Sequence, residues 1–204
     1  MNKFTRRTVI AAACAAAAMT FAPMSFAQQA PEKKDVTIAV GGKSLYYYLP
    51  LSIAEQLGYF KDEGLNVKIV DFQGGSRSLQ AVVGGSADVV SGAFEHTISM
   101  QAKKQPMTAF VLQGRAPQLA LVVSNKTMKD YKQLSDLKGK KVGVTAPGSS
   151  SQMVANFILK KGGLGPKDVA FIGVGSSSGA VSAIRSGQID ALINLDPVIT
   201  ILLK

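Results

Sequence analysis

The sequence predicts an α/β protein of two similar lobes, each a mostly parallel sheet flanked by helices, and three observations support this fold class. Residues 67–90 align without a gap on residues 169–192, and both read as an apolar strand, a Gly/Ser turn, a short helix and a second apolar strand. The segment VTIAVGGKS from residue 36 likewise matches VGVTAPGSS from residue 142. Residues 130–141 have no apolar run and separate the two units. Two tandem units of strand, turn and helix favour two α/β lobes.

The expected elements follow from hydrophobic periodicity and from helix start and stop residues. Pro50 suits an early position in a helix, and Gly64 suits the end of the same helix. The apolar runs MTAFVLQG and QLALVVS, near residues 107–124, are expected to be strands that carry the chain between the lobes. We assign residues 28–124 to lobe 1 and residues 125–204 to lobe 2. The other expected strands cover residues 35–40, 66–72, 87–91, 141–145, 169–174 and 189–193, and the expected helices cover residues 50–63, 76–84, 94–104, 149–161 and 178–186.

Residues 1–27 read as a cleaved export signal. Lys3, Arg6 and Arg7 form a positively charged start, and an uncharged, alanine-rich apolar stretch follows. Ser25 and Ala27 are the small residues that a signal peptidase reads, so we expect cleavage after Ala27. The apolar stretch is short and contains a proline, which disfavours a transmembrane anchor. The sequence therefore predicts a periplasmic protein, and TRRTVI leaves the twin-arginine export route open beside the general one.

Composition argues against several kinds of site. The one cysteine, Cys14, lies inside the predicted signal, so we expect the exported chain to have neither a disulfide nor a thiol nucleophile. The one histidine, His96, disfavours a zinc site, which would need carboxylates almost alone. We therefore expect no metal and no cofactor. The formal net charge of +10 is spread over separate lysine pairs rather than gathered on one face with aromatic residues, which argues against nucleic-acid binding.

Two motifs resemble enzyme sites but lack what those sites need. GGKS, residues 41–44, ends like a phosphate loop, but Thr37 stands where the loop requires its first glycine, and the spacer is the strand itself. GSSSG, residues 175–179, has the pattern of a hydrolase elbow with Ser177 as the nucleophile. Such an elbow needs a histidine later in the chain, and His96 precedes it. We expect neither nucleotide binding nor nucleophilic catalysis, and we predict that the chain is not an enzyme.

Gly/Ser turns recur where an expected strand ends and a helix begins, and they predict a shared ligand cleft. Parallel α/β sheets bind ligands beyond the carboxyl ends of their strands, where helix N-termini offer free N–H groups and a partial positive charge. In any single turn Ser and Gly are simply caps, but five turns at matching points of two lobes favour a small-molecule site. Lys43 and Arg77 stand beside two of these turns and suit an anionic group. Tyr46 to Tyr48 suit a stacking wall, and we expect at least one of them to pack on the core.

Several segments resemble the periplasmic solute-binding proteins of ABC transporters. PLSIAEQLGYFKDEGLNVKIV, ADVVSG, LSDLKGKKVGVTAPGSSS and AIRSGQIDALINLDPVIT, together with the export signal, are similar to the branch that serves nitrate, sulfonate, taurine and bicarbonate uptake and includes thiamine-pyrimidine-precursor proteins. The resemblance implies the type II periplasmic-binding fold, whose lobes are joined by crossover strands and close on a ligand like a hinge. It implies a pocket between the lobes. The candidate ligand-binding residues are Gly42, Lys43, Ser44, Tyr46, Gly75, Ser76, Arg77, Phe94, Glu95, Gly148, Ser149, Ser150, Ser151, Asn194 and Asp196.

The same resemblance implies a transport function. The chain would bind a small organic or inorganic anion, such as a sulfonate, taurine or nitrate, and would deliver it to an ABC transporter permease that is driven by a separate ATPase. We expect it to be a monomer. Two alternative functions stay open. The chain could be an enzyme of the same fold that acts in the synthesis of the thiamine pyrimidine precursor, or it could be a ligand-sensing module. The sequence does not name the ligand.

Length is where the chain departs from this family. Such proteins usually run to roughly 300 residues, close to two domain lengths, and the chain returns from the second lobe to finish the first. This sequence stops at Lys204, after the apolar segment LDPVITILLK. We therefore expect a chain that is truncated at its C-terminus and that lacks the return crossing and some pocket contacts.

Overall fold

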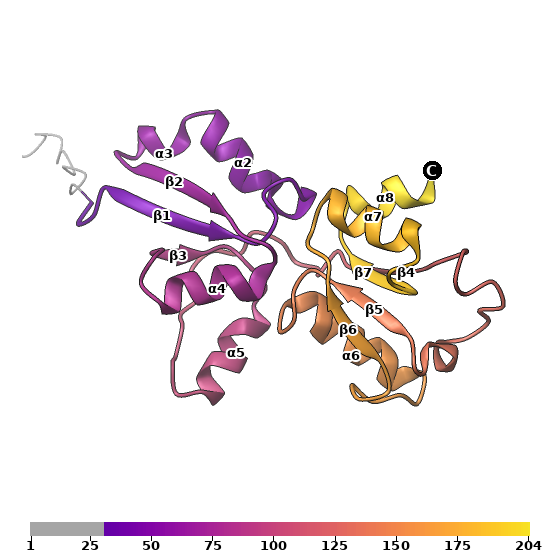
Figure 1. Cartoon of the computed structure of the whole chain (residues 1–204). Helices are drawn as coiled ribbons and strands as arrows, with labels where there is room; N and C mark the ends of the chain where they lie inside the picture. The colour runs from indigo at the N-terminus through magenta and orange to yellow at the C-terminus, as the bar shows by residue number, and fades with distance from the viewer. Residues whose placement is uncertain (1–30) are drawn as a thin grey trace, which may run out of the picture. The chain divides into compact units, whose positions relative to one another are not determined.

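The computed structural model describes residues 31–204, which contain two β-sheets, and the predicted signal peptide lies outside the described residues. The first sheet has three parallel strands in the order β2–β1–β3 (Figure 1). β1 (Asp35–Val40) pairs along its whole length with β2 (Asn66–Asp71), and β3 (Val89–Val90) pairs with the other edge of β1. The central position of β1 explains why its second half, Ile38 to Val40, is buried.

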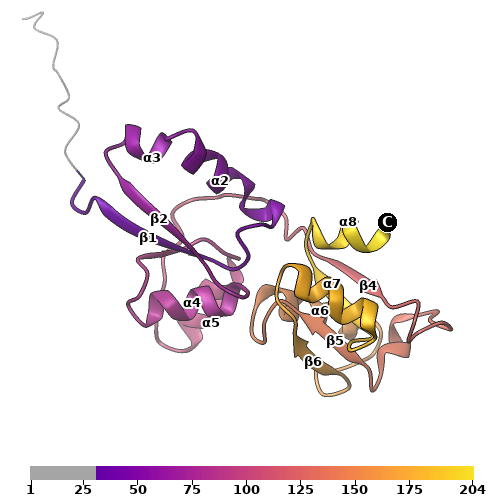
Figure 2. The ribbon, with the colours of Figure 1, turned by 45° about the horizontal axis from the view of Figure 1, so that its top comes forward.

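Helices cover both faces of the first sheet. η1 (Tyr46–Tyr48), α2 (Leu49–Gln56) and α3 (Tyr59–Asp62) follow β1, whereas α4 (Gly75–Val83) follows β2 and α5 (Glu95–Ala102) follows β3. α2 and α3 lie on one side of the sheet and α4 lies on the other (Figures 1 and 2). This follows because β2 and β3 flank β1 on opposite edges, so right-handed crossovers to them fall on opposite faces.

One expected helix is divided in two. The sequence predicts a single helix over residues 50–63, but Gly58 has a left-handed backbone with φ of 82° and separates α2 from α3. A left-handed residue cannot continue a right-handed helix, and glycine adopts this conformation without a steric penalty.

The second sheet has four strands in the order β4–β7–β5–β6. β4 (Ala120–Val123) is antiparallel to β7 (Ala191–Asn194), whereas β5 (Lys141–Val144) is parallel to both β7 and β6 (Ala170–Gly173). Every residue of β7 is buried, as expected for a central strand that is covered on both faces, and its first three residues are apolar. The helical elements of this unit are η2 (Leu134–Leu137), α6 (Ser150–Lys161), α7 (Ser178–Ser186) and α8 (Val198–Leu203).

The internal repeat has a structural cause in its two aspartates. The Asp88 carboxylate accepts a hydrogen bond from the Thr37 backbone N–H at 2.9 Å, and the Asp190 carboxylate accepts one from the Lys141 backbone N–H, also at 2.9 Å. Asp88 thus ties the end of its repeat to β1, and Asp190 ties the end of its repeat to β5. The hydrogen bonds from Lys33 and Thr37 hold the pKa of Asp88 below its usual value.

Of the two strands expected to carry the chain between the lobes, one is absent and one is present. Residues 107–114 form no strand, because no neighbouring strand of the described chain offers them hydrogen-bond partners, and the apolar residues Phe110 to Leu112 are exposed. Gln113 alone fixes this segment, since it accepts a hydrogen bond from Ser91 and donates one to the Tyr47 carbonyl. The other expected crossover strand is β4, which pairs with β7 in the second sheet.

Candidate functional site

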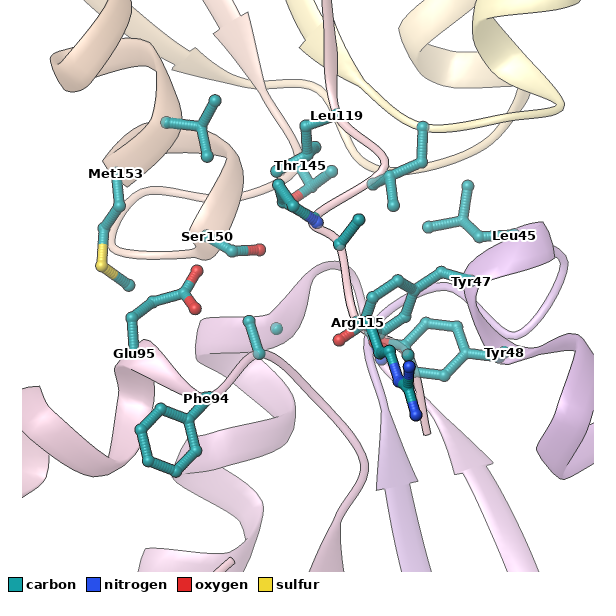
Figure 3. Close-up of a pocket in the computed structure, with 18 of the residues that line it drawn as sticks. Leu45, Tyr47, Tyr48, Phe94, Glu95, Arg115, Leu119, Thr145, Ser150 and Met153 are labelled. Atoms are coloured by element: carbon teal, nitrogen blue, oxygen red, sulfur yellow. The ribbon is translucent and has the colours of Figure 1, made fainter. Parts of the chain in front are cut away.

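A cavity of about 440 Å³ lies where the N-termini of three helices meet the segment that links the two sheets (Figure 3). α4 contributes Gly75, α5 contributes Glu95 and α6 contributes Ser150, each of which is the first residue of its helix. Residues 114–117 of the linking segment complete one wall. This volume falls within the range of about 300 to 1,000 Å³ that is typical of small-molecule pockets.

The order of strands and helices accounts for this convergence. α4, α5 and α6 follow the carboxyl ends of β2, β3 and β5, which are parallel strands of their sheets. The first turn of each helix has backbone N–H groups without a partner inside the helix, and the helix dipole is positive at this N-terminal end. A site built from helix N-termini therefore suits a negatively charged or hydrogen-bond-accepting group.

Two tyrosines at the end of the turn after β1 form a rigid part of the wall. The rings of Tyr47 and Tyr48 pack edge to face, with centroids 5.0 Å apart. The Tyr48 hydroxyl accepts a hydrogen bond from the Gly41 backbone N–H at 3.0 Å, and burial raises the pKa of Tyr48 to about 12. Burial also raises the pKa of Tyr47, and the negative charge of Glu95 adds to this effect. Both phenols are therefore neutral at physiological pH.

Apolar side chains supply much of the remaining lining. Met153 and Phe157 come from α6, and Phe94 precedes α5. Phe94 and Phe157 are 66% and 62% exposed, whereas large aromatic side chains are usually well buried. Rings left open at the wall of a cavity offer contact area to the apolar part of an organic ligand.

Arg115 and Glu95 are the charged residues of this lining. They stand at separate places in the close-up view (Figure 3), and no ion pair joins either of them to another described residue. Lys43 behaves differently, because its ammonium group pairs with the Glu55 carboxylate at 2.7 Å. An unpaired guanidinium at a cavity wall can bind a carboxylate, sulfonate or phosphate with two parallel hydrogen bonds.

A buried cluster of three hydroxyl groups fixes the turn before α6. The Oγ1 atom of Thr145 lies 2.8 Å from Ser149 Oγ and 2.9 Å from Ser151 Oγ, and the two serine hydroxyls lie 2.9 Å from each other. Ser149 and Ser151 are fully buried. Their hydroxyls therefore hold the turn in place, and Ser150 between them is the serine that lines the cavity.

Gly41 brings the turn after β1 against the start of α4. A Cβ atom on Gly41 would lie 2.4 Å from the backbone nitrogen of Gly75 and 2.5 Å from the carbonyl carbon of Gly74. Gly41 and Gly75 both line the cavity. The two chain segments can approach this closely only because no side chain lies between them. This contact explains the glycine of GGKS without any phosphate.

The Gly41→Ala substitution is expected to lower the free energy of unfolding by about 1 to 3 kcal/mol, because the clash is with backbone rather than with a movable side chain. Chemical denaturation followed by circular dichroism measures this change. Gly165→Ala is the matched control, since the nearest atom to its new Cβ, Asp168 Oδ2, would lie at an ordinary 3.6 Å. An equal loss in both variants would show that the close approach at Gly41 does not matter.

His96 lies beneath the first residue of α4. Its side chain is buried, its Nε2 atom has no hydrogen-bond partner, and this atom lies 3.2 Å from the place of a Cβ on Gly75. Burial lowers the pKa of His96, Glu95 opposes this shift, and Lys103 adds to it. The folded protein therefore holds this imidazole neutral.

Acidification below pH 6.5 is expected to destabilise the fold through His96. Its folded pKa lies below the ordinary value of 6.5, so the unfolded chain binds the proton first, and stability falls by at most about 1.4 kcal/mol per pH unit. The loss begins as the pH falls through 6.5 and stops below the folded pKa. The melting temperature at pH 7.5 and 5.5 measures it. His96→Phe is expected to lose less stability over this interval than the native protein, and an equal loss would contradict the assignment.

The predicted ligand-binding residues fall into three groups. Gly75, Phe94, Glu95 and Ser150 line the cavity described above. Ser44 and Arg77 line a second, more polar cavity of about 640 Å³, together with residues such as Asp71 and Ser176. Nine others line neither cavity, and these are Gly42, Lys43, Tyr46, Ser76, Gly148, Ser149, Ser151, Asn194 and Asp196.

Most residues outside the two cavities have structural hydrogen bonds. The backbone N–H groups of Gly42 and Lys43 donate to the Asp71 carboxylate, each at 2.8 Å. The Ser76 hydroxyl donates to the Pro147 carbonyl at 2.9 Å. The remaining contacts in this set are Gly148 to Gln152, Tyr46 to the Asp196 carbonyl, Asn194 to Gly175 and Leu195, and Asp196 to Thr200.

Several lining residues were not predicted from the sequence. Arg115 and Met153 are the most informative of them, whereas Tyr47 belongs to the tyrosine run that the sequence offered as a stacking wall. Arg115 lies in GRAP, a Gly/Pro-containing break between two apolar runs, and a charged residue in such a break was the available signal. Met153 reads as an ordinary position of α6, and only the orientation of the helix directs it to the cavity.

No helix within residues 31–204 is long and apolar enough to span a membrane. The same residues contain no cluster of three or more His, Cys, Asp or Glu side chains placed to hold a metal ion.

This architecture is the type II periplasmic-binding fold. A solved structure of a Bordetella bronchiseptica protein matches with a TM-score of 0.82 at 65% sequence identity, covering 84% of this chain and 54% of that one. The alkanesulfonate-binding protein SsuA from Xanthomonas axonopodis pv. citri, bound to MOPS, matches with a TM-score of 0.63 at 22% identity, covering 85% and 58% of the two chains. The second likeness concerns the fold alone.

The chain belongs to the family described as NMT1/THI5 like, which it matches over residues 46–200. One curated relative is the 4-amino-5-hydroxymethyl-2-methylpyrimidine phosphate synthase of Schizosaccharomyces pombe, which is 27% identical over 162 residues. The match covers 79% of this chain and 45% of the relative. The chain thus spans about half the length of the curated relatives it matches.

Proposed function

We propose that the protein is the solute-binding component of an ABC transporter, which binds a small anionic solute in the cavity of about 440 Å³ and delivers it to a membrane permease driven by a separate ATPase. The observation that carries this proposal is the meeting of three helix N-termini with the unpaired Arg115. Each of these groups stabilises negative charge, and a cavity of this size admits a small molecule.

The surroundings of the cavity fit binding better than catalysis. Both wall tyrosines are neutral, and His96, the one histidine of the sequence, is buried and does not line the cavity. SsuA, which shares the fold, is named as an alkanesulfonate-binding protein. Together with the predicted export signal, this supports a periplasmic location for the chain.

A synthase is the second candidate function, because the curated relative from Schizosaccharomyces pombe is named as one. That reaction would need groups able to transfer protons or form covalent bonds at the cavity. Glu95 is the one carboxylate among the lining residues. The binding proposal and this alternative differ in whether the ligand is recovered unchanged.

A thermal-shift screen followed by titration calorimetry tests the proposal. The purified protein is mixed with sulfonates, taurine, nitrate, aromatic acids and thiamine precursors, and each compound that raises the melting temperature is titrated. The proposal expects saturable binding of at least one anion, with the compound recovered unchanged by mass spectrometry. Conversion of the compound into a product would favour the synthase function. If no anion raised the melting temperature, the proposal that the cavity binds anions would be contradicted.

A further inference from the structure

Resting on the function proposed above, we infer that the cavity selects an amphoteric organic solute: one with an anionic group for Arg115, a hydrogen-bond-donating or cationic group for Glu95, and an apolar body between them. Inorganic anions such as nitrate are then poor ligands. Glu95 is the residue that determines this preference.

The first step is the charge of Glu95. Its carboxylate lines the cavity and has no ion-pair partner among residues 31–204, where the ion pairs found are Lys33 with Asp88 and Lys43 with Glu55. Glu95 opens α5, where the positive end of the helix dipole interacts favourably with a negative charge. The cavity therefore presents a negative charge as well as the positive charge of Arg115.

The second step is the effect of this charge on a bound anion. A carboxylate repels an anion held nearby, and the repulsion grows in a site from which water is displaced. The charge also reaches the aromatic wall, because Glu95 helps to raise the pKa of Tyr47. A solute with an amino or hydroxyl group placed against Glu95 turns this repulsion into a charge-assisted hydrogen bond.

The third step is the separation of the two charges. Figure 3 shows Glu95 with Met153 and Ser150 on one side of the view, and Arg115 apart from them. A solute that touches both charges must therefore extend across the cavity. The lining of this cavity is otherwise largely apolar and includes the exposed rings of Phe94 and Phe157. Apolar contact with these rings favours a carbon skeleton over an inorganic ion.

Matched ligand pairs test the inference. The first pair is 4-(aminomethyl)benzoate and 4-methylbenzoate, the second pair is taurine and ethanesulfonate, and nitrate is the inorganic probe. Titration calorimetry of the native protein is expected to show at least about tenfold tighter binding of the amino member in one pair or both, as a hydrogen bond to a charged group provides. Nitrate is expected to bind more weakly than either amino compound.

The Glu95→Gln variant assigns the effect to one residue. It is expected to bind the amino member no more than about threefold more tightly than its partner, while binding of 4-methylbenzoate or ethanesulfonate stays equal or improves. Asp130→Asn is the control, because it removes the same charge from an exposed residue that does not line the cavity. This control is expected to keep the native preference.

Two outcomes separate this inference from the proposed function. If the native protein binds the plain anions or nitrate as tightly as the amino compounds, the inference is overturned and the anion-binding function stands. The same holds if the preference for the amino compound survives in Glu95→Gln. If neither these probes nor any anion of the wider screen binds, the inference and the proposed function are both overturned.

Discussion

Replacing Arg115 with alanine is expected to weaken the binding of an anionic solute by about 10- to 100-fold, which corresponds to the loss of a hydrogen-bonded ion pair. Arg115 is the only cation of the cavity lining among the described residues, and it has no protein partner there that would compete with the solute. The free protein therefore loses no ion pair in the variant, and its melting temperature without ligand should change little. Titration calorimetry with the tightest anion of the screen measures the effect.

Two companion variants make the result specific. Arg115→Lys keeps the charge but loses the planar pair of donors, so an intermediate affinity is expected. Lys68→Ala removes a positive charge from an exposed position on β2 outside the cavity lining, and it is expected to bind like the native protein. Unchanged affinity in Arg115→Ala, or an equal loss in Lys68→Ala, would show that Arg115 does not contact the solute.

Replacing Leu192 with alanine is expected to lower the free energy of unfolding by about 2 to 5 kcal/mol, the usual result of removing a fully buried leucine. Leu192 is 0% exposed in the central strand β7, and it faces Gly143 of β5 and Val122 of β4. Gly143 has no side chain that could fill the space left behind. A loss of this size is a large part of the total stability of about 5 to 15 kcal/mol that is typical of folded proteins.

Urea denaturation followed by circular dichroism measures this loss. Leu203→Ala makes the same chemical change at a side chain that is 75% exposed, so a change within about 0.5 kcal/mol is expected. The core assignment would be wrong if the two variants lost equal stability. Leu192 also belongs to the buried cluster that includes Val40 and Tyr48, so its loss is expected to loosen the tyrosine wall as well.

The fold could be predicted largely from the sequence, because the internal repeat and the apolar runs both indicate two α/β units of strand, turn and helix. The runs at 35–40 and 141–145 became β1 and β5, and the repeated aspartates Asp88 and Asp190 make the same hydrogen bond in both sheets. The strand expected at 107–114 does not form, because strand formation depends on pairing with residues elsewhere in the chain. A strand exists only where another strand lies beside it, and its own sequence does not contain that information.

The candidate site could be predicted only in part. Ser149, Ser150 and Ser151 are equivalent in sequence, yet two of them are buried in the hydroxyl cluster and the third lines the cavity. The rotation of about 100° per residue at the start of a helix decides which serine faces outward. Lys43 is predicted as an anion contact, but its ammonium group pairs with the carboxylate of Glu55, which lies on the following helix α2.

The most direct test of the central claim is a crystal structure of the protein with an anionic solute that raises its melting temperature. The solute is expected to lie in the cavity of about 440 Å³, with its anionic group about 2.7 to 3.2 Å from the Arg115 guanidinium or from the backbone N–H groups that open α4 and α6. Solute bound instead in the second cavity, against Ser44 and Arg77, would contradict it.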